Sequence, residues 1–101
     1  MTPIWRGLGG TSGNRLTVQV YYDIIRATHS LVKAGKTPTM YSVGRIAGLP
    51  YGRLKARLVE LHNLGLIDSD TGVTTKGYEF CEDYLKRVVP VFLKYGLGRP
   101  D

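Results

Sequence analysis

The sequence predicts a single, mainly α domain of the α+β class, in which helices surround one small β-hairpin. A length of 101 residues suits one compact domain and is too short for two. Apolar residues recur every three or four positions in four segments, the spacing of helices that bury one face. Residues 66–74 break this rhythm and carry the turn residues of a hairpin.

The composition is that of a soluble protein that stays inside the cell. Hydrophobic residues make up 43% and charged residues 22%, and no apolar run approaches the roughly 18 residues that span a bilayer. The first fifteen residues contain no continuous apolar stretch, so a secretory signal is not expected. The single cysteine, Cys81, fits a reducing compartment. We therefore expect a cytoplasmic protein.

The N-terminal stretch 1–14 is glycine-rich and lacks periodicity, which predicts a flexible arm. Its GLGGTSG motif lacks the Lys-Ser/Thr ending and the preceding strand of a phosphate-binding loop. Arg6 and Arg15 are cations that could enter a DNA minor groove, with an unstructured tail as the alternative.

The first helix is expected from Leu16 to about Ala34, with Thr17 as a candidate cap and Gly35 as its stop. Its apolar residues mark two faces. Such a helix needs cover on both sides, from its own core and from another body such as a second subunit.

Two short helices follow, joined by three or four residues that include a glycine, which is the arrangement of a helix-turn-helix. The first runs from about Met40 to Ala47 and ends at Gly48, with three residues facing inward: Val43, Ile46 and Ala47. The second runs from Pro50 or Tyr51 to Asn63 and closes at Gly65. Its inward residues are Leu54, Leu58, Leu61 and Leu64.

A small hairpin is expected next, with a first strand over 66–69, a turn over 70–72 and a return strand at Val73 and Thr74. Thr75 is then expected to cap a last helix, from about Lys76 to Tyr95. Pro90 removes one backbone donor and should bend this helix near its end.

The last helix carries two apolar stripes. One has spacings of 3, 4, 3, 4 and 3, the seam of a coiled coil, and predicts a homodimer interface made of Tyr78, Cys81, Leu85, Val88, Phe92 and Tyr95. The other should pack against the domain itself and consists of Phe80, Tyr84 and Val91.

Charge is segregated along the chain, whose net charge is +6. No acidic residue lies between Asp23 and Glu60, an interval that contains seven bases: Arg26, Lys33, Lys36, Arg45, Arg53, Lys55 and Arg57. A local positive potential of this kind attracts a polyanion, nucleic acid first and an acidic membrane second. An ordinary solvated basic surface is the alternative.

The stretches YGRLKARLVELHNLGLID and VTTKGYEFCEDYLKRV resemble archaeal-type winged helix-turn-helix DNA-binding proteins that dimerise through a long terminal helix. The resemblance covers about residues 15–95. It implies an arm at 1–14, a winged helix-turn-helix domain at 15–75, a C-terminal dimerisation helix at 76–96 and a tail at 97–101. Two features differ from that family: Pro50 stands where a Ser or Asn cap is usual, and the wing is very short.

The resemblance implies that the third helix lies in the major groove of double-stranded DNA. With Leu54 facing inward, Gly52, Ala56 and Val59 fall on the outer side, and the small Gly52 and Ala56 let the backbone approach base pairs. Arg53 and Lys55 flank that side. The DNA-binding residues we expect are Arg45, Tyr51, Gly52, Arg53, Lys55, Ala56, Arg57 and Lys76.

The expected protein is a transcriptional regulator or chromatin-associated protein that associates with the nucleoid, is not an enzyme, and needs no metal or cofactor. His29 and His62 have no metal-ligand spacing with each other or with Cys81, and no catalytic triad can be assembled. Two alternatives remain open: a winged helix that binds only proteins, and one that binds RNA.

Overall fold

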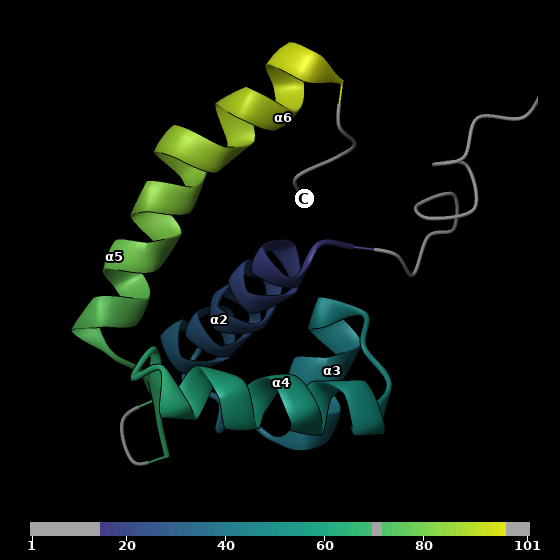
Figure 1. The fold of residues 1–101 in the computed structure, drawn as a ribbon. Helices are drawn as coiled ribbons and strands as arrows, with labels where there is room; N and C mark the ends of the chain where they lie inside the picture. Colours follow the sequence, from purple (N-terminus) through teal and green to yellow (C-terminus); the bar gives the residue numbers. More distant parts are fainter. Residues whose placement is uncertain (1–14, 70–71, 97–101) are drawn as a thin grey trace, which may run out of the picture.

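The computed structural model describes residues 15–69 and 72–96 (Figure 1). The elements in chain order are α2 (Thr17–Lys33), α3 (Met40–Ala47), α4 (Tyr51–Asn63), β1 (Ile67–Asp68), β2 (Gly72–Val73), α5 (Thr75–Asp83), the π-helical η1 (Tyr84–Val88) and α6 (Val89–Tyr95). The chain is thus mainly helical with one two-stranded antiparallel sheet, as the sequence predicts. The arm 1–14 with Arg6, turn residues 70 and 71, and the tail 97–101 lie outside the described residues.

The start of α2 is capped from inside the helix. The Gln19 side chain accepts a hydrogen bond of 2.9 Å from the backbone N–H of Leu16, the residue that precedes the helix. Thr17, the candidate cap, is instead the first helical residue. The glutamine takes this role because a side chain three residues along reaches back to the N-cap backbone.

Helices α3 and α4 have the bounds that the sequence predicts. The hydroxyl of Thr39 caps α3 by accepting a hydrogen bond of 3.1 Å from the backbone N–H of Ser42. Gly48 ends α3 in the left-handed conformation, with φ of 70°, which only glycine adopts at little cost. Pro50 then leads directly into α4.

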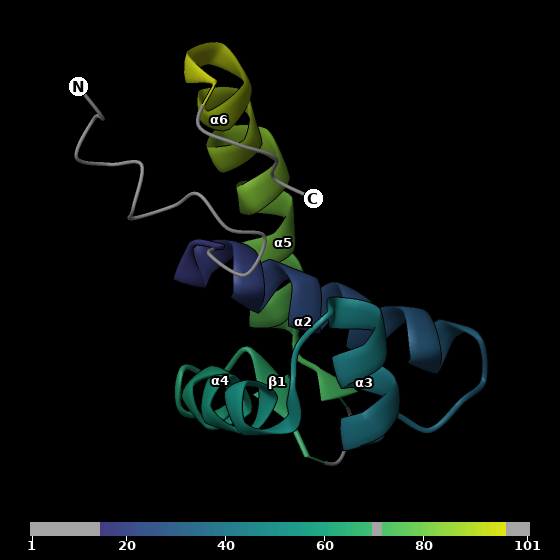
Figure 2. The same cartoon turned by 90° about the vertical axis from the view of Figure 1, so that its right-hand side faces the viewer.

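The core lies where α2 crosses α3 and α4, closed on one side by the hairpin (Figure 2). Its buried residues are Ile24, Ile25, Ala27, Leu31, Val43, Ala47, Leu54, Leu61, Leu66 and Val73.

Two of the leucine and isoleucine positions expected in the core are exposed instead: Ile46 and Leu64. Gly44 explains the first, because it is buried against α4, and a Cβ there would lie 3.3 Å from Leu54. This close approach turns the Gly44 side of α3 inward and leaves Ile46 outside. Leu64 is exposed because it lies one residue past the end of α4, away from the inward-facing leucines of that helix.

The hairpin is short and joins α4 to α5. Ile67 pairs with Val73 and Asp68 with Gly72, so Gly72 belongs to the return strand rather than to the turn. Thr74, not Thr75, caps α5, because its hydroxyl accepts a hydrogen bond of 3.0 Å from the backbone N–H of Gly77.

Gly77 holds the first turn of α5 against the hairpin. A Cβ at this position would lie 2.2 Å from the carbonyl oxygen of Leu66 and 2.9 Å from the Val73 side chain. No side chain larger than hydrogen fits there without a shift of the backbone. The glycine therefore determines how closely the C-terminal helical segments, which are α5, η1 and α6, dock onto the rest of the domain.

The C-terminal helical segments pack against α2 at their start and then extend away from it (Figures 1 and 2). Tyr84 is 1% exposed and stacks on Tyr22 of α2, with ring centroids 4.4 Å apart. The disturbance expected at Pro90 takes the form of a π turn just before it, in which the Val89 N–H bonds to the carbonyl of Tyr84, five residues back. Proline lacks an N–H and crowds the carbonyl four residues before it, so a wider turn relieves the clash.

Candidate nucleic-acid interface

The outer face of α4 is open and small, as its helical phase predicts. Leu54 and Leu61 are fully buried, whereas Gly52 and Ala56 are exposed on the opposite side. A Cβ built at Gly52 meets no atom within 4 Å. The backbone in the first turns of α4 is therefore accessible to a large partner on this side, whereas Val59 on the next turn adds an exposed branched side chain there.

Three of the expected DNA-binding cations are exposed and unpaired. Arg53 and Lys55 flank the outer face of α4, and Arg45 lies on α3. Within the described ranges, none of the three takes part in an ion pair or hydrogen bond. Because no acidic residue occurs between Asp23 and Glu60, these charges remain available to an anionic partner.

Arg57, a fourth expected cation, is instead paired within the domain. Its guanidinium lies 3.0 Å from the Glu60 carboxylate, which also accepts a hydrogen bond of 2.6 Å from the Tyr21 hydroxyl on α2. The hydrogen bond to Glu60, with burial second, raises the pKa of Tyr21. The three side chains tie α4 to α2, so Arg57 is only partly available for phosphate.

Lys76, the expected cation beside the hairpin, is also engaged. Its ammonium donates a hydrogen bond of 2.8 Å to the carbonyl of Leu64, just after the end of α4. The Thr74 hydroxyl donates another, of 2.7 Å, to the carbonyl of Gly65. Both satisfy carbonyls that a helix end leaves without partners.

Arg15 is a structural residue rather than part of a free arm. Its guanidinium forms an ion pair of 2.6 Å with Asp23, and it donates to the carbonyls of Ala47 and Gly48 at 2.8 and 3.0 Å. From its place just before α2, it thereby caps the end of α3. The hypothesis that Arg15 enters a minor groove does not fit these contacts.

One exposed aromatic residue beside this face was missed by the sequence analysis. Tyr41 lies on α3 four residues before Arg45, hence on the same side of the helix. Together with Tyr51, which was expected to contact phosphate or sugar, it lines a cleft of about 440 Å³. The pairing of an aromatic with a cation at i and i+4 was the available sequence signal.

A groove of about 320 Å³ runs between α2 and α5. It contains the first three residues of the predicted dimer stripe, Tyr78, Cys81 and Leu85, which face Tyr22 and Ile25 of α2. Its lining is almost entirely apolar. Partial burial raises the pKa of the Cys81 thiol to about 11, so this thiol is neutral at physiological pH.

Tyr78 has a polar neighbour on the rim of this groove. Its hydroxyl lies 3.1 Å from Nδ1 of His29, and the two rings meet edge to face with centroids 5.2 Å apart. His29 is thus held in a structural contact between α2 and α5. This is a role for a histidine that needs neither a metal nor a substrate.

The π turn divides the predicted dimer stripe into two parts. A π turn takes about one residue more than an α turn, so residues eight apart, rather than seven, share a side across it. Tyr84 and Phe92 accordingly share the buried side, with Phe92 only 5% exposed. Leu85 and Leu93, 51% and 69% exposed, share the open side. Phe92 therefore does not continue the face of Leu85.

The remaining stripe residues differ in exposure. Val88 is half-buried and Tyr95 is exposed. Of the second stripe, expected to pack inward, Tyr84 is buried and Phe80 is half-buried, while Val91 is exposed. Whether any of these residues meets a second chain stays a prediction.

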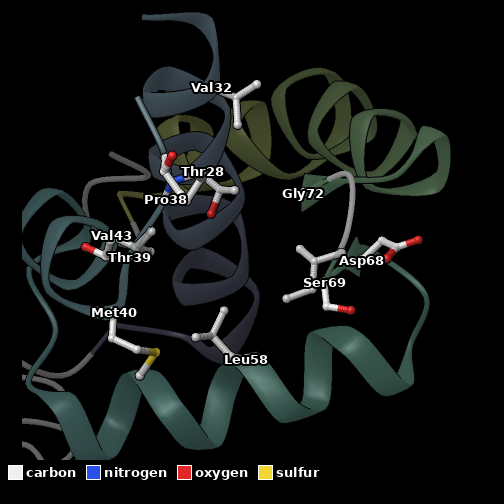
Figure 3. Close-up of a pocket in the computed structure, with 12 residues that line it drawn as sticks. Thr28, Val32, Pro38, Thr39, Met40, Val43, Leu58, Asp68, Ser69 and Gly72 are labelled. Atoms are coloured by element: carbon white, nitrogen blue, oxygen red, sulfur yellow. The ribbon is translucent and has the colours of Figure 1, made fainter. Parts of the chain in front are cut away.

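A separate cavity of about 460 Å³ lies between the hairpin, α2, the start of α3 and α4 (Figure 3). Leu58 and Met40 lie along one side of it, with Val32 and Gly72 across from them. Its lining is mainly apolar. It offers space for a small apolar group.

Among residues 15–69 and 72–96, no group of three or more His, Cys, Asp or Glu side chains is placed to hold a metal ion. In the same part of the chain, no helix is long and apolar enough to cross a membrane.

Comparison of the chain with protein-family models, with curated proteins and with solved structures finds no match in any of the three. Function must therefore be inferred from the chain's own residues and their geometry.

Proposed function

We propose that the chain is a winged helix-turn-helix protein that binds double-stranded DNA as a homodimer and acts in transcriptional regulation or chromatin organisation. In this proposal α3 and α4 are the helix-turn-helix, β1 and β2 the short wing, and α4 the helix that enters the major groove.

One observation carries the DNA-binding proposal. The outer face of α4 combines exposed small residues, Gly52 and Ala56, with the unpaired cations Arg53 and Lys55 on its flanks. Small residues permit close approach to base edges, and the cations can contact guanine or phosphate. Val59 lies on the next turn of the same side and is exposed, so the strip of small residues is confined to the first two turns of α4.

Fluorescence anisotropy with labelled duplex DNA at about 50 and 200 mM salt tests this proposal. Three unpaired cations, Arg45, Arg53 and Lys55, predict a slope of log affinity against log salt of about −3 per protomer. RNA of the same sequence is the parallel probe. The absence of duplex binding at the lower salt, or a preference for RNA, would contradict the proposal.

A substitution on the outer face separates groove binding from loose attraction to phosphate. Gly52→Leu places a large side chain where nothing lies within 4 Å, so the fold should tolerate it while the approach to the groove is blocked. We expect at least a tenfold loss of duplex affinity with an unchanged circular dichroism spectrum. Asn63→Leu, at the last turn of the same helix, is the matched control and should bind almost normally.

The homodimer is proposed on the open side of the C-terminal helical segments. Leu85 and Leu93 are exposed there, and the apolar groove between α2 and α5 continues from Leu85. An exposed apolar surface of this kind usually marks an interface. A second chain bound in this groove would also cover the second apolar face of α2.

Light scattering at micromolar concentration tests the dimer. The unchanged protein should have the mass of two chains, and Leu85→Asp the mass of one. Val91→Asp, on another side of the helix, should leave the dimer intact. A single-chain mass for the unchanged protein would remove the dimer from the proposal.

The same groove also favours a second candidate function, in which the domain binds another protein and no DNA. This candidate predicts a monomer that shows no duplex binding at low salt. The anisotropy and light-scattering measurements together distinguish the two functions.

A further inference from the structure

The cleft beside the outer face of α4 has the chemistry of a base-binding site. It lies on the first turns of α3 and α4, has a volume of about 440 Å³ and is mainly apolar. Its lining residues are Met40, Tyr41, Gly44, Arg45, Leu49 and Tyr51.

Two tyrosines border this cleft. Tyr41 is 77% exposed and Tyr51 is 64% exposed. In the described part of the chain, neither forms a ring contact or a hydrogen bond. Two unpartnered aromatic rings at one apolar cleft leave flat faces available for another flat group, and base-to-aromatic stacking is how proteins hold single-stranded nucleic acid.

Arg45 supplies the complementary charge. It follows Tyr41 by one helical turn, lines the same cleft and is unpaired. The surrounding segment, residues 24–59, contains no acidic residue. An apolar cleft lined by two open tyrosine rings and one unpaired guanidinium matches a nucleotide, whose base is flat and whose phosphate is anionic.

We propose that this cleft receives one unpaired base of a DNA strand, stacked against Tyr41, while Arg45 binds the adjoining phosphate. The inference rests on the proposed function in that α4 holds the neighbouring duplex. Tyr51 is directly followed by Gly52 and Arg53, so the cleft adjoins the face that would meet the groove. The protein would then prefer a duplex that carries an unpaired nucleotide over a fully paired one.

A paired base cannot enter the cleft, because its neighbours in the stack cover both of its faces. Stacking of one base on an aromatic side chain should therefore tighten binding only where a base is free. The expected preference for the unpaired nucleotide is roughly 5- to 100-fold.

The experiment uses one duplex sequence in two forms, with 2-aminopurine either paired or in a one-nucleotide bulge, together with the single strand that carries it. Anisotropy gives the affinities, and 2-aminopurine fluorescence reports stacking. We expect tighter binding and quenched fluorescence for the bulged form. Tyr41→Ala should abolish the preference with little change for the paired duplex, Tyr41→Phe should keep it, and Tyr95→Ala, an exposed tyrosine on α6, should change neither.

Each outcome bears on one proposal or the other. Equal affinity for the paired and bulged forms overturns the cleft and leaves duplex binding intact. An equal loss for both forms in Tyr41→Ala overturns it too, because the side chain then contacts the backbone of paired DNA. Binding to the bulged and single-stranded forms without the paired one supports the cleft and removes the duplex function, and binding to none removes both.

Discussion

Three cations on α3 and α4 and two cations on η1 are the same residue types in opposite situations. Arg45, Arg53 and Lys55 have no partner in the described structure. Lys86 lies 2.5 Å from Glu82, and Arg87 lies 3.9 Å from Asp83, each one helical turn away. The hydrogen bond with Lys86 lowers the pKa of Glu82, and the same contact raises that of Lys86.

This difference shows that counting basic residues does not locate a nucleic-acid surface. A base that is neutralised by its own helix contributes little to the field around the protein, whereas a base without an acidic partner contributes its full charge. The two regions also differ in their apolar residues, since α4 buries Leu54 and Leu61 while the C-terminal helical segments leave Leu85 and Leu93 exposed.

The largest effect is expected from a substitution at the contact between α5 and the hairpin, which connects these two regions. In Gly77→Ala, the added Cβ would lie 2.2 Å from the Leu66 carbonyl oxygen, so the backbone must shift. We expect a loss of about 3 kcal/mol in the free energy of unfolding, measured by urea denaturation. Gly52→Ala is the control, because its Cβ meets nothing within 4 Å, and it should be neutral or stabilising by up to about 1 kcal/mol. Equal effects of the two would mean that α5 does not dock closely on the hairpin.

The next effect compares one arginine from each region. Arg53→Ala should weaken duplex binding by about 1 to 3 kcal/mol if this side chain reads a base. Arg87→Ala removes the same charge from η1 and should leave affinity within about 0.5 kcal/mol, because exposed paired charges matter little. Anisotropy at fixed salt measures both. An equal loss from both substitutions would show that only total charge attracts DNA.

A smaller effect is expected on the salt dependence. Lys55→Ala should make the slope of log affinity against log salt shallower by about 1, the loss of one phosphate contact. Lys86→Ala should leave the slope unchanged, since Glu82 already neutralises that ammonium. If the slope changes only for Lys86→Ala, the DNA lies on the C-terminal helical segments.

The smallest effect concerns the thiol in the groove between α2 and α5. Burial raises the pKa of Cys81 to about 11, and the thiolate is the reactive form. Labelling by a thiol-specific disulfide reagent should therefore be slow at pH 8 and accelerate as the pH approaches 11. Protein unfolded in urea should label readily at pH 8. Fast labelling of the folded protein at that pH would mean that the groove is open to water around the sulfur.

Much of the fold could be predicted from local signals. The bounds of α3 and α4 follow from apolar spacing, from Gly48 and from Gly65, because glycine tolerates the positive φ with which each helix ends. The outer face of α4 follows from the same periodicity. The capping residues were less predictable. Gln19 and Thr74 cap their helices in place of the neighbouring Thr17 and Thr75, because the local path of the backbone brings their side chains to the unpaired N–H groups.

The candidate site was predicted less completely. The sequence indicated which residues are basic and which side of α4 is small, but not which cations other residues neutralise. Arg15 and Lys76 turn to backbone carbonyls that the fold brings near them, from positions far along the chain. Tyr41 was missed because its partner in the cleft, Tyr51, belongs to another helix.

The sequence by itself determined the order of helices and hairpin, the segregation of charge and the inward side of α4, because these depend on residue type and spacing within a few turns. Only the tertiary structure decided which cations are free, where two tyrosines share a cleft, and how the π turn before Pro90 rotates Phe92 away from the face of Leu85. The free cations and the shared cleft depend on contacts between distant segments, and the rotation of Phe92 depends on one extra residue in a turn. The spacing of side chains along the chain shows neither of these causes.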